Sequence, residues 1–272
     1  MSSSGHLANF KILFGVDTET GLLFDVLLHI GTLAAICVVY YKDVLKMIVE
    51  GIGLIRDCII NFVRFIGNKT GRTDEPYLRL VNSSYRKLVV LIIVSTIPTG
   101  IIGVVGKDVV EMASEILLIP GICLILTAVL LFIADHAKDG DKLPKGVTYT
   151  NAFGVGIAQG IATLPGLSRS GTTITACLLS GFNRNFAVKY SFLMSIPAIL
   201  GALVLELKDY TAAALSGAEI AYYVVGMIVA AVVGYVCIKT MLIVVRRKKF
   251  TGFAIYCLIV GVISIGGYIY MA

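Results

Sequence analysis

Six stretches of this chain are apolar over the length that an α-helix needs to cross a bilayer, and no other feature limits the fold as much. About 20 helical residues span the ~30 Å hydrocarbon core of a membrane. Charged residues make up 15% of the chain, well below the about 25% of soluble domains. We therefore predict an all-α, polytopic membrane protein. Its six predicted transmembrane helices are Leu22–Tyr41, Leu88–Val105, Ile116–Ala134, Ala187–Leu207, Ile220–Val245 and Gly252–Met271.

The basic residues lie mainly on one side of this arrangement. Of the 23 Lys and Arg residues, 18 fall in segments that six spans place on the same side, namely 42–87, 138–145, 184–189 and 246–249. Loops rich in Lys and Arg stay in the cytoplasm. We therefore expect this side to be cytoplasmic and the 107–115 turn to face outward. The net charge of +6 is explained by this bias, so we expect no nucleic acid partner.

The remaining segments suggest how the chain is divided. Residues 44–67 are amphipathic and too rich in charge for a span, so we predict a helix lying in the membrane interface. Segment 135–150 is polar and separates three spans from three spans. We predict a first repeat over 1–134, a cytoplasmic linker over 135–150 and a second repeat over 151–272.

The two halves share a short motif, which supports a repeat. Ser2-Ser3-Ser4-Gly5-His6 and Ser168-Arg169-Ser170-Gly171-Thr172 both read S-x-S-G-x. Because each half holds three spans, two such halves have opposite orientations in the membrane. An inverted-topology repeat places its site where broken helices meet at the interface between the halves.

The second copy of the motif lies in the run TLPGLSRSGTT, residues 163–173, within the apolar segment 151–182. A straight helix through Pro165 would lose a backbone hydrogen bond, so we predict a re-entrant hairpin. Such a loop suits an anion: Gly166 and Gly171 allow close approach, the following helix directs its N-terminus inward, and Arg169 offers a guanidinium fork. Hydroxyl donors would come from Ser168, Ser170, Thr172 and Thr173. The alternative is an arginine that only holds the loop through carbonyl groups.

The run PGLSRSGTT, with Gln159-Gly160 before it and the S-x-S-G-H element in the other half, resembles the undecaprenyl-diphosphate phosphatase family of bacitracin-resistance membrane proteins. The likeness extends over essentially the whole chain. It implies six spans with two re-entrant hairpins in an inverted repeat. It also implies removal of the terminal phosphate of undecaprenyl diphosphate, a lipid carrier of cell-wall precursors used in peptidoglycan synthesis, with the active site facing outward from the cell membrane.

The resemblance also implies roles for individual residues. His6 and Ser3 match the proposed catalytic pair, in which histidine activates a hydroxyl or a water. Arg169 would bind the diphosphate. The other substrate-binding residues implied by the motif are Ser168, Ser170, Gly166, Gly171, Thr173 and Gln159. The implied partners are the lipid substrate and membrane lipids, and a homodimer is one further option.

One part of the family pattern is missing. Family members carry a Glu-x-x-x-Glu motif before the S-x-S-G-H element, and they are thought to use it with a divalent cation, Mg²⁺ or Ca²⁺. This sequence begins just after that point, so we predict no metal ligands here and little activity for the chain as written. Two alternatives to a membrane hydrolase therefore stay open: a transporter or flippase for an anionic lipid or solute, and an inactive truncated product.

Overall fold

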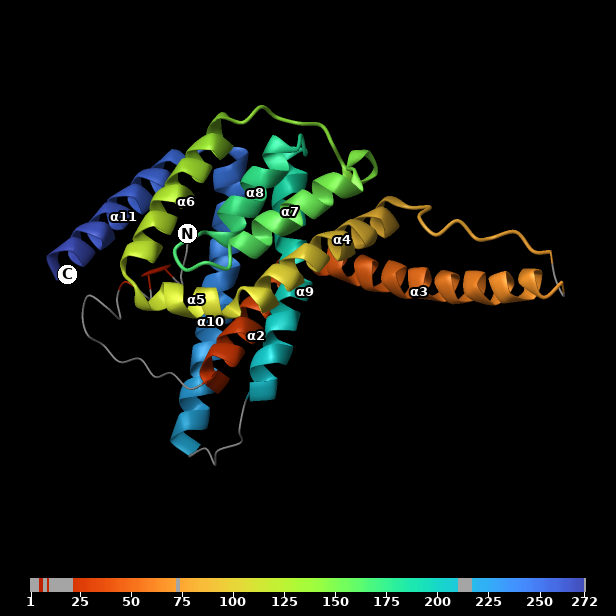
Figure 1. The fold of residues 1–272 in the computed structure, drawn as a ribbon, viewed down its shortest axis with the longest axis horizontal. Coiled ribbons are helices and arrows are strands. Elements are labelled where there is room, and N and C mark those ends of the chain that lie inside the picture. The colour runs from red at the N-terminus through yellow and green to blue at the C-terminus, as the bar shows by residue number, and fades with distance from the viewer. Residues whose placement is uncertain (1–4, 7–8, 10–21, 72–73, 210–216, 272) are drawn as a thin grey trace.

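The computed structural model describes residues 5–6, 9, 22–71, 74–209 and 217–271, and these residues are arranged as a helical bundle (Figure 1). The α-helices are α2 (Leu22–Val39), α3 (Tyr41–Lys69), α4 (Ser84–Val105), α5 (Lys107–Glu115), α6 (Leu118–His136), α7 (Tyr149–Ile161), α8 (Arg169–Leu179), α9 (Arg184–Asp209), α10 (Gly217–Arg246) and α11 (Thr251–Met271), with a short 3₁₀ turn at Pro144–Gly146.

Five of these helices (α4, α6, α9, α10 and α11) are long and apolar enough to cross a membrane, and the described side chains of α2 add a shorter apolar helix, Val26–Val39. Helices satisfy their own backbone hydrogen bonds, which is what a bilayer interior requires of a spanning segment. The prediction of an all-α, polytopic membrane protein is confirmed.

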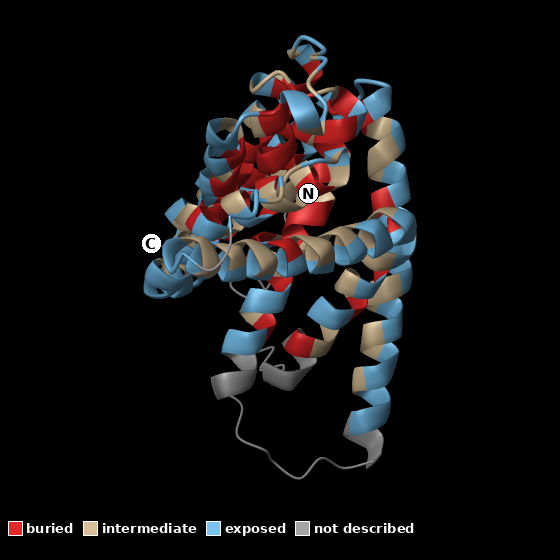
Figure 2. Cartoon of the chain, turned by 90° about the vertical axis from the view of Figure 1, so that its right-hand side faces the viewer, coloured by how far each residue is buried: buried red, intermediate tan, exposed pale blue. Residues whose placement is uncertain are grey.

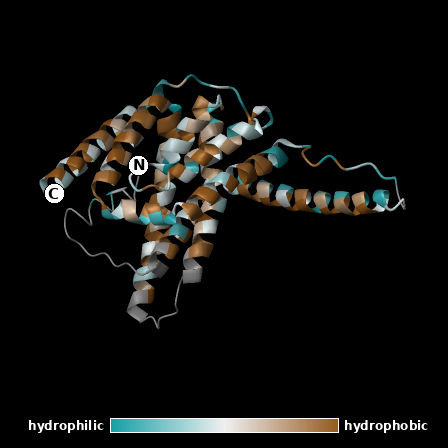
Figure 3. Ribbon diagram, in the orientation of Figure 1, coloured by the Kyte–Doolittle hydropathy of each residue, from teal (hydrophilic) through white to brown (hydrophobic). Residues whose placement is uncertain are grey.

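Apolar side chains cover much of the outer surface. Val225, Val229 and Val236 of α10 are more than half exposed, and Figure 3 shows that hydrophobic residues predominate along the long helices. Buried residues gather instead in the upper part of the view in Figure 2. The buried core includes Ile174 of α8 and Leu193 of α9. Exposed apolar surface on this scale suits lipid rather than water.

The first two predicted spans and the predicted 107–115 turn differ from the helices in the structure. α2 ends at Val39, and α3 begins at Tyr41 after a single turn residue. α4 begins four residues earlier than predicted, because Ser83 caps the helix by accepting a hydrogen bond from the Arg86 backbone at 3.1 Å. The predicted 107–115 turn is the helix α5.

α3 covers the predicted interfacial helix 44–67 and projects from the bundle, with the segment that follows it running back alongside (Figure 1). Its inner face is anchored to α4, because Arg86 forms ion pairs with Asp57 at 2.6 Å and with Glu50 at 3.0 Å. Its outer face exposes apolar side chains such as Ile52 and Phe62. The position of this face in the membrane interface stays a prediction.

One end of the bundle carries segment 135–150 and the run 246–249, and we call it the basic end. Asp135, in the last turn of α6, caps α11 by accepting hydrogen bonds from the backbone N–H groups of Phe250 at 2.9 Å and Thr251 at 2.7 Å. Arg184, at the start of α9, donates to the carbonyl of Ala134. These contacts bring the last turn of α6 and the first turns of α9 and α11 together.

α6 and α11 approach each other closely at Gly121 and Gly261. A Cβ atom added to Gly121 would lie 3.2 Å from the carbonyl oxygen of Gly261, and one added to Gly261 would lie 2.8 Å from that of Gly121. Small residues allow such approach between membrane helices. The pair forms a support against which both motif regions pack.

Candidate functional site

α7 and α8 form a helical hairpin whose two ends lie at the basic end. α7 packs on α4, and α8 contacts α6, α7 and α9. The exit of α8 is held by segment 140–142, since the backbone N–H of Lys142 donates to the carbonyl of Gly181 at 3.1 Å and Asn183 donates back to Lys142 at 3.0 Å. Since α7 also begins next to this segment, the hairpin enters and leaves the bundle at the same end.

The turn between the two helices is fixed by its sequence. Leu167 donates its backbone N–H to the carbonyl of Leu164 at 3.1 Å, with Pro165 and Gly166 between them and a Gly166 φ of 92°. This is the pattern of a type II turn, in which the third residue needs a positive φ. A Cβ at Gly166 would also lie 2.4 Å from the Pro120 carbonyl oxygen. Glycine is therefore required for both conformation and space.

The first turn of α8 is capped by Ser168 and leaves donors available. The Ser168 hydroxyl accepts from the backbone of Gly171 at 3.2 Å, and its carbonyl accepts from Thr172 at 2.8 Å. Among the described residues, the backbone N–H groups of Arg169 and Ser170 have no hydrogen-bond partner. Free N–H groups at a helix N-terminus, together with the helix dipole, favour an anion.

Arg169 adds a full positive charge at this helix end. Its side chain is exposed, although α8 is flanked by three other helices. Within the described part of the chain, the guanidinium forms no hydrogen bond or ion pair. An arginine at membrane depth is costly unless it faces water, a partner or a ligand. The arrangement thus presents an accessible guanidinium beside two free N–H groups.

The other predicted residues of the loop divide into two groups. Ser170 is half-buried and lies beside Arg169. Thr173 is fully buried, and its hydroxyl contacts the Arg169 carbonyl at 2.9 Å and the Ser191 hydroxyl at 2.5 Å. Ser168 and the two glycines are also buried. In this structure the buried residues shape the loop, and their direct contact with substrate stays a prediction.

Gln159 lies near the end of α7 and is only 1% exposed. Its Nε2 donates to the Thr99 hydroxyl at 3.4 Å, and its Oε1 has no partner among the described residues. The Thr99 hydroxyl in turn donates to the Gly156 carbonyl at 2.8 Å. Gln159 is therefore part of the contact between α4 and α7, and its role in substrate binding stays a prediction.

The first motif contacts α11. His6 Nε2 lies 3.0 Å from the Tyr256 hydroxyl, and Asn9 donates to the Ser264 hydroxyl at 2.6 Å. Among the described residues, no hydrogen bond joins His6 to Arg169. Each motif region does contact one member of the α6–α11 pair. The predicted catalytic Ser3 lies outside the described residues.

One residue at the site was missed by sequence reasoning. The hydroxyl of Thr127, in α6, donates to the Gly166 carbonyl at 3.0 Å and accepts from the Ser168 backbone at 2.9 Å. The sequence held a signal for it, because Thr127 is the only hydroxyl-bearing residue in the predicted span Ile116–Ala134.

The described residues do not fit the divalent cation that the resemblance implies. In the part of the chain that the structure describes, no three His, Cys, Asp or Glu side chains gather into a group that could hold a metal. The side chains beside the turn are hydroxyls and a guanidinium, whereas Mg²⁺ and Ca²⁺ prefer carboxylate oxygens. We therefore derive no reaction step through a metal.

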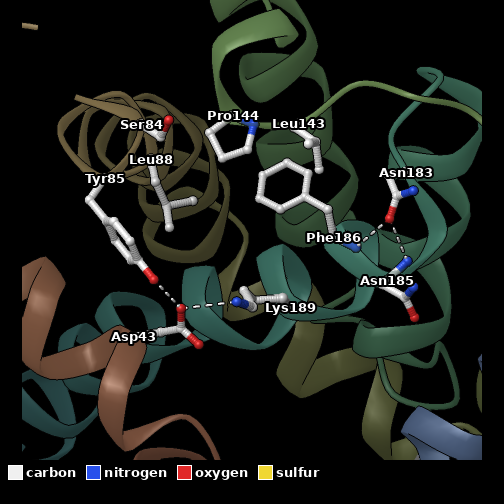
Figure 4. Close-up of a pocket in the computed structure, with 10 residues that line it drawn as sticks. All are labelled: Asp43, Ser84, Tyr85, Leu88, Leu143, Pro144, Asn183, Asn185, Phe186 and Lys189. Carbon is white, nitrogen blue, oxygen red and sulfur yellow. Dashed lines mark hydrogen bonds and ion pairs between the residues drawn. The ribbon is translucent and has the colours of Figure 1, made fainter. Parts of the chain in front are cut away.

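A cavity of about 290 Å³ lies at the basic end rather than at the turn of the hairpin (Figure 4). Inside it, Asp43 accepts a hydrogen bond from Tyr85 at 2.8 Å and forms an ion pair with Lys189 at 2.9 Å. None of the predicted site residues lines this cavity, and its lysine is already neutralised. It is not the candidate site.

Comparisons with known proteins agree with the resemblance found in the sequence. The family model described as bacitracin resistance protein BacA matches residues 1–263. Three similar proteins are each named undecaprenyl-diphosphatase. That of Methanosphaera stadtmanae is 38% identical over 97% of this chain and 90% of its own length. That of Alkaliphilus metalliredigens is 39% identical over 97% of this chain and 91% of its own length. That of Halothermothrix orenii is 37% identical over 97% of this chain and 90% of its own length.

Proposed function

The chain belongs to the bacitracin resistance protein BacA family, and from this premise we propose that it hydrolyses undecaprenyl diphosphate to undecaprenyl phosphate and inorganic phosphate. The product is the lipid carrier that peptidoglycan synthesis uses again, and its regeneration gives resistance to bacitracin. The observation that carries the proposal is the exposed, unpaired guanidinium of Arg169 at the N-terminus of α8. The family match favours this hydrolase over the transporter alternative.

The geometry supports a binding mode for the diphosphate. Arg169 would hold it through its fork of N–H donors. The free N–H groups of Arg169 and Ser170 would add two backbone donors. Such donors stabilise the charge that spreads over the phosphoryl oxygens in the transition state. The isoprenoid chain would lie against the exposed apolar helices, since that surface suits lipid.

For the chemical step, the proposal uses the pair that the sequence predicts. His6 takes the proton of the attacking oxygen, either the Ser3 hydroxyl or a water. That oxygen forms a bond to the terminal phosphorus as the bridging P–O bond breaks. Undecaprenyl phosphate leaves with the electron pair of that bond, and any phosphoserine is then hydrolysed by water. Arg169 stabilises the phosphoryl oxygens throughout.

We also propose the location and orientation of the site. The chain is a multi-pass membrane protein, and the basic end would face the cytoplasm of a cell membrane. The site would then be approached from outside. The homodimer that the sequence left as an option stays a prediction.

The test measures phosphate release from undecaprenyl diphosphate in detergent micelles and in vesicles. Two forms are compared: the 272-residue chain, and an extended form preceded by a segment that carries the Glu-x-x-x-Glu motif of the family pattern. We expect the extended form to release phosphate, and Arg169→Ala in that form to abolish release. Movement of undecaprenyl phosphate across vesicles without phosphate release by either form would favour the transporter alternative and contradict the proposal.

A further inference from the structure

We infer that Thr127, in the middle of α6, is a positioning residue that holds the Arg169 loop of the hairpin in its binding geometry. The inference rests on the proposed function, because it gives Thr127 a part in diphosphate binding. Thr127 itself is 1% exposed. Its side chain therefore acts through the loop backbone and not by touching the substrate.

The Thr127 hydroxyl acts both as a hydrogen-bond donor and as an acceptor. It donates to the carbonyl of Gly166 at 3.0 Å and accepts from the backbone N–H of Ser168 at 2.9 Å. These two backbone groups flank Leu167, whose own N–H closes the turn onto Leu164. A single hydroxyl thus joins the end of the turn to the residue that caps α8.

The loop needs this partner because of its position. Non-helical backbone at membrane depth must be satisfied by protein or by water, and a buried N–H or C=O without a partner is destabilising. Among the described residues, Thr127 is the partner that the structure gives to the Gly166 carbonyl and to the Ser168 N–H. Without the Thr127 hydroxyl, the Gly166 carbonyl and the Ser168 N–H would be left without a hydrogen-bond partner unless the loop moved.

Other residues on the same face of α6 extend this support. Pro120 and Cys123 lie one to two turns before Thr127 and contact Gly166, and Leu131 lies one turn after Thr127 and contacts Gly171. Residues spaced by three, four or seven share one helix face. α6 therefore packs against the whole loop, from the turn at Gly166 to the first turn of α8. The Thr127 hydroxyl is the polar contact in the middle of this packing.

Loss of the Thr127 hydroxyl would also affect Arg169, because Arg169 is the residue directly after Ser168. Thr127 fixes the N–H of Ser168, and Ser168 caps the first turn of α8 through Gly171. Arg169 follows directly, so the direction of its side chain and of its free N–H depends on where Ser168 sits. Displacement of a binding group by about 1 Å can cost about 100-fold in rate.

The test compares Thr127→Val, which keeps the shape and removes the hydroxyl, with Thr127→Ser, which keeps the hydroxyl. Thr175→Val is the matched control. Thr175 of α8 is equally buried and also contacts α6, since its hydroxyl lies 3.1 Å from the carbonyl of Leu130 and 2.7 Å from that of Gly171. Its loss removes a donor but deprives no backbone group of the turn of its partner.

Three quantities are measured for each variant of the 272-residue chain and of its extended form. They are the affinity for undecaprenyl diphosphate by thermophoresis, kcat and KM for phosphate release, and the unfolding temperature. We expect Thr127→Val to weaken binding by about tenfold or more, because the loop that carries Arg169 would shift from its binding geometry. Thr127→Ser should restore most of the affinity. Thr175→Val should lower the unfolding temperature by less than Thr127→Val does, because it leaves no backbone group of the turn unsatisfied, and it should leave the affinity within about threefold.

A double-mutant cycle shows whether Thr127 acts through Arg169. In an Arg169→Lys background, Thr127→Val should cause little further loss of affinity, since residues that act as a unit are not additive. An undiminished loss in that background, or equal effects of Thr127→Val and Thr175→Val on affinity, would overturn the inference.

The two proposals fail in different ways. If the unmutated forms bind undecaprenyl diphosphate but release no phosphate, the proposed hydrolysis fails, while the affinities still decide the role of Thr127. If they neither bind nor hydrolyse it, both proposals are overturned.

Discussion

Arg169 is an exposed cation at the start of a helix that three other helices flank. Its chemistry, and not only its charge, suits a diphosphate. The guanidinium is a planar fork that can donate two parallel hydrogen bonds to phosphate oxygens, whereas a lysine ammonium is a point charge on a flexible stem. The site is therefore sensitive to a change that preserves the charge.

Arg169→Lys in the extended form should lower kcat/KM for phosphate release by about 100-fold, since losing two charge-assisted contacts corresponds to roughly 3 kcal/mol. Arg247→Lys is the matched control, because Arg247 is an exposed arginine of the basic end and should tolerate the change. A rate near that of the parent for Arg169→Lys would make Arg169 a structural residue of the loop.

Gly166→Ala tests the turn itself. A side chain at φ 92° is strained, and its Cβ would meet the Pro120 carbonyl at 2.4 Å, so we expect a loss of roughly 3 kcal/mol or more in stability. Gly154→Ala in the same hairpin has nothing within 4 Å of the added Cβ and should be stabilising by about 0.5–1 kcal/mol. Unfolding temperatures in detergent distinguish them. Equal temperatures for the two variants would show that the turn relaxes freely.

At the level of helices, the sequence predicted what depends on composition and missed what depends on tertiary contacts. Each apolar stretch is a helix, and Pro165 with Gly166 located the turn. The extra first turn of α4 depends on the Ser83 cap and on the ion pairs that Arg86 forms with acidic residues of α3. The inward hydroxyl of Thr173 depends on Ser191, 18 residues away. Neither contact leaves a periodic pattern in the sequence.

The contacts of the basic end should respond to acid. Lys248 and Arg184 hold the pKa of Asp139 below its ordinary value. A carboxylate with a lowered pKa stabilises the fold above its ordinary pKa of about 4, and this contribution disappears as the pH falls through the lower folded value.

Asp139→Asn should therefore lower the unfolding temperature at pH 7, and the difference from the parent should vanish as the pH falls below about 4. The effect should be small, about 1 kcal/mol or less, because Asp139 is half-exposed and its charges are screened by solvent. Asp141→Asn, two residues along, serves as the control. A difference that persists unchanged below the ordinary pKa would mean that the Asp139 ion pairs are not its cause.

Across the whole molecule, the two predicted repeats are interlocked rather than separate. α2 packs on α10, α6 packs on α11, and α4 packs on the hairpin helix α7, so each contact joins residues before the 135–150 segment to residues after it. The α6–α11 contact is also where both motif regions are supported, through Gly166 on α6 and through His6 and Asn9 on α11. This is the arrangement expected of an inverted repeat, whose site lies between its halves. The repeat itself stays a prediction.

The orientation of this bundle decides from which side the lipid reaches Arg169. The exposed Met112 of α5 lies in the segment expected outside, and the exposed Asp141 lies at the basic end. With the opposite orientation, most of the 23 basic residues would have to cross the bilayer. In a cysteine-free background, a membrane-impermeant maleimide added to intact cells should label Met112→Cys and reach Asp141→Cys only after permeabilisation. Labelling of Asp141→Cys alone would reverse the topology, and a site open to the outside could not then be maintained.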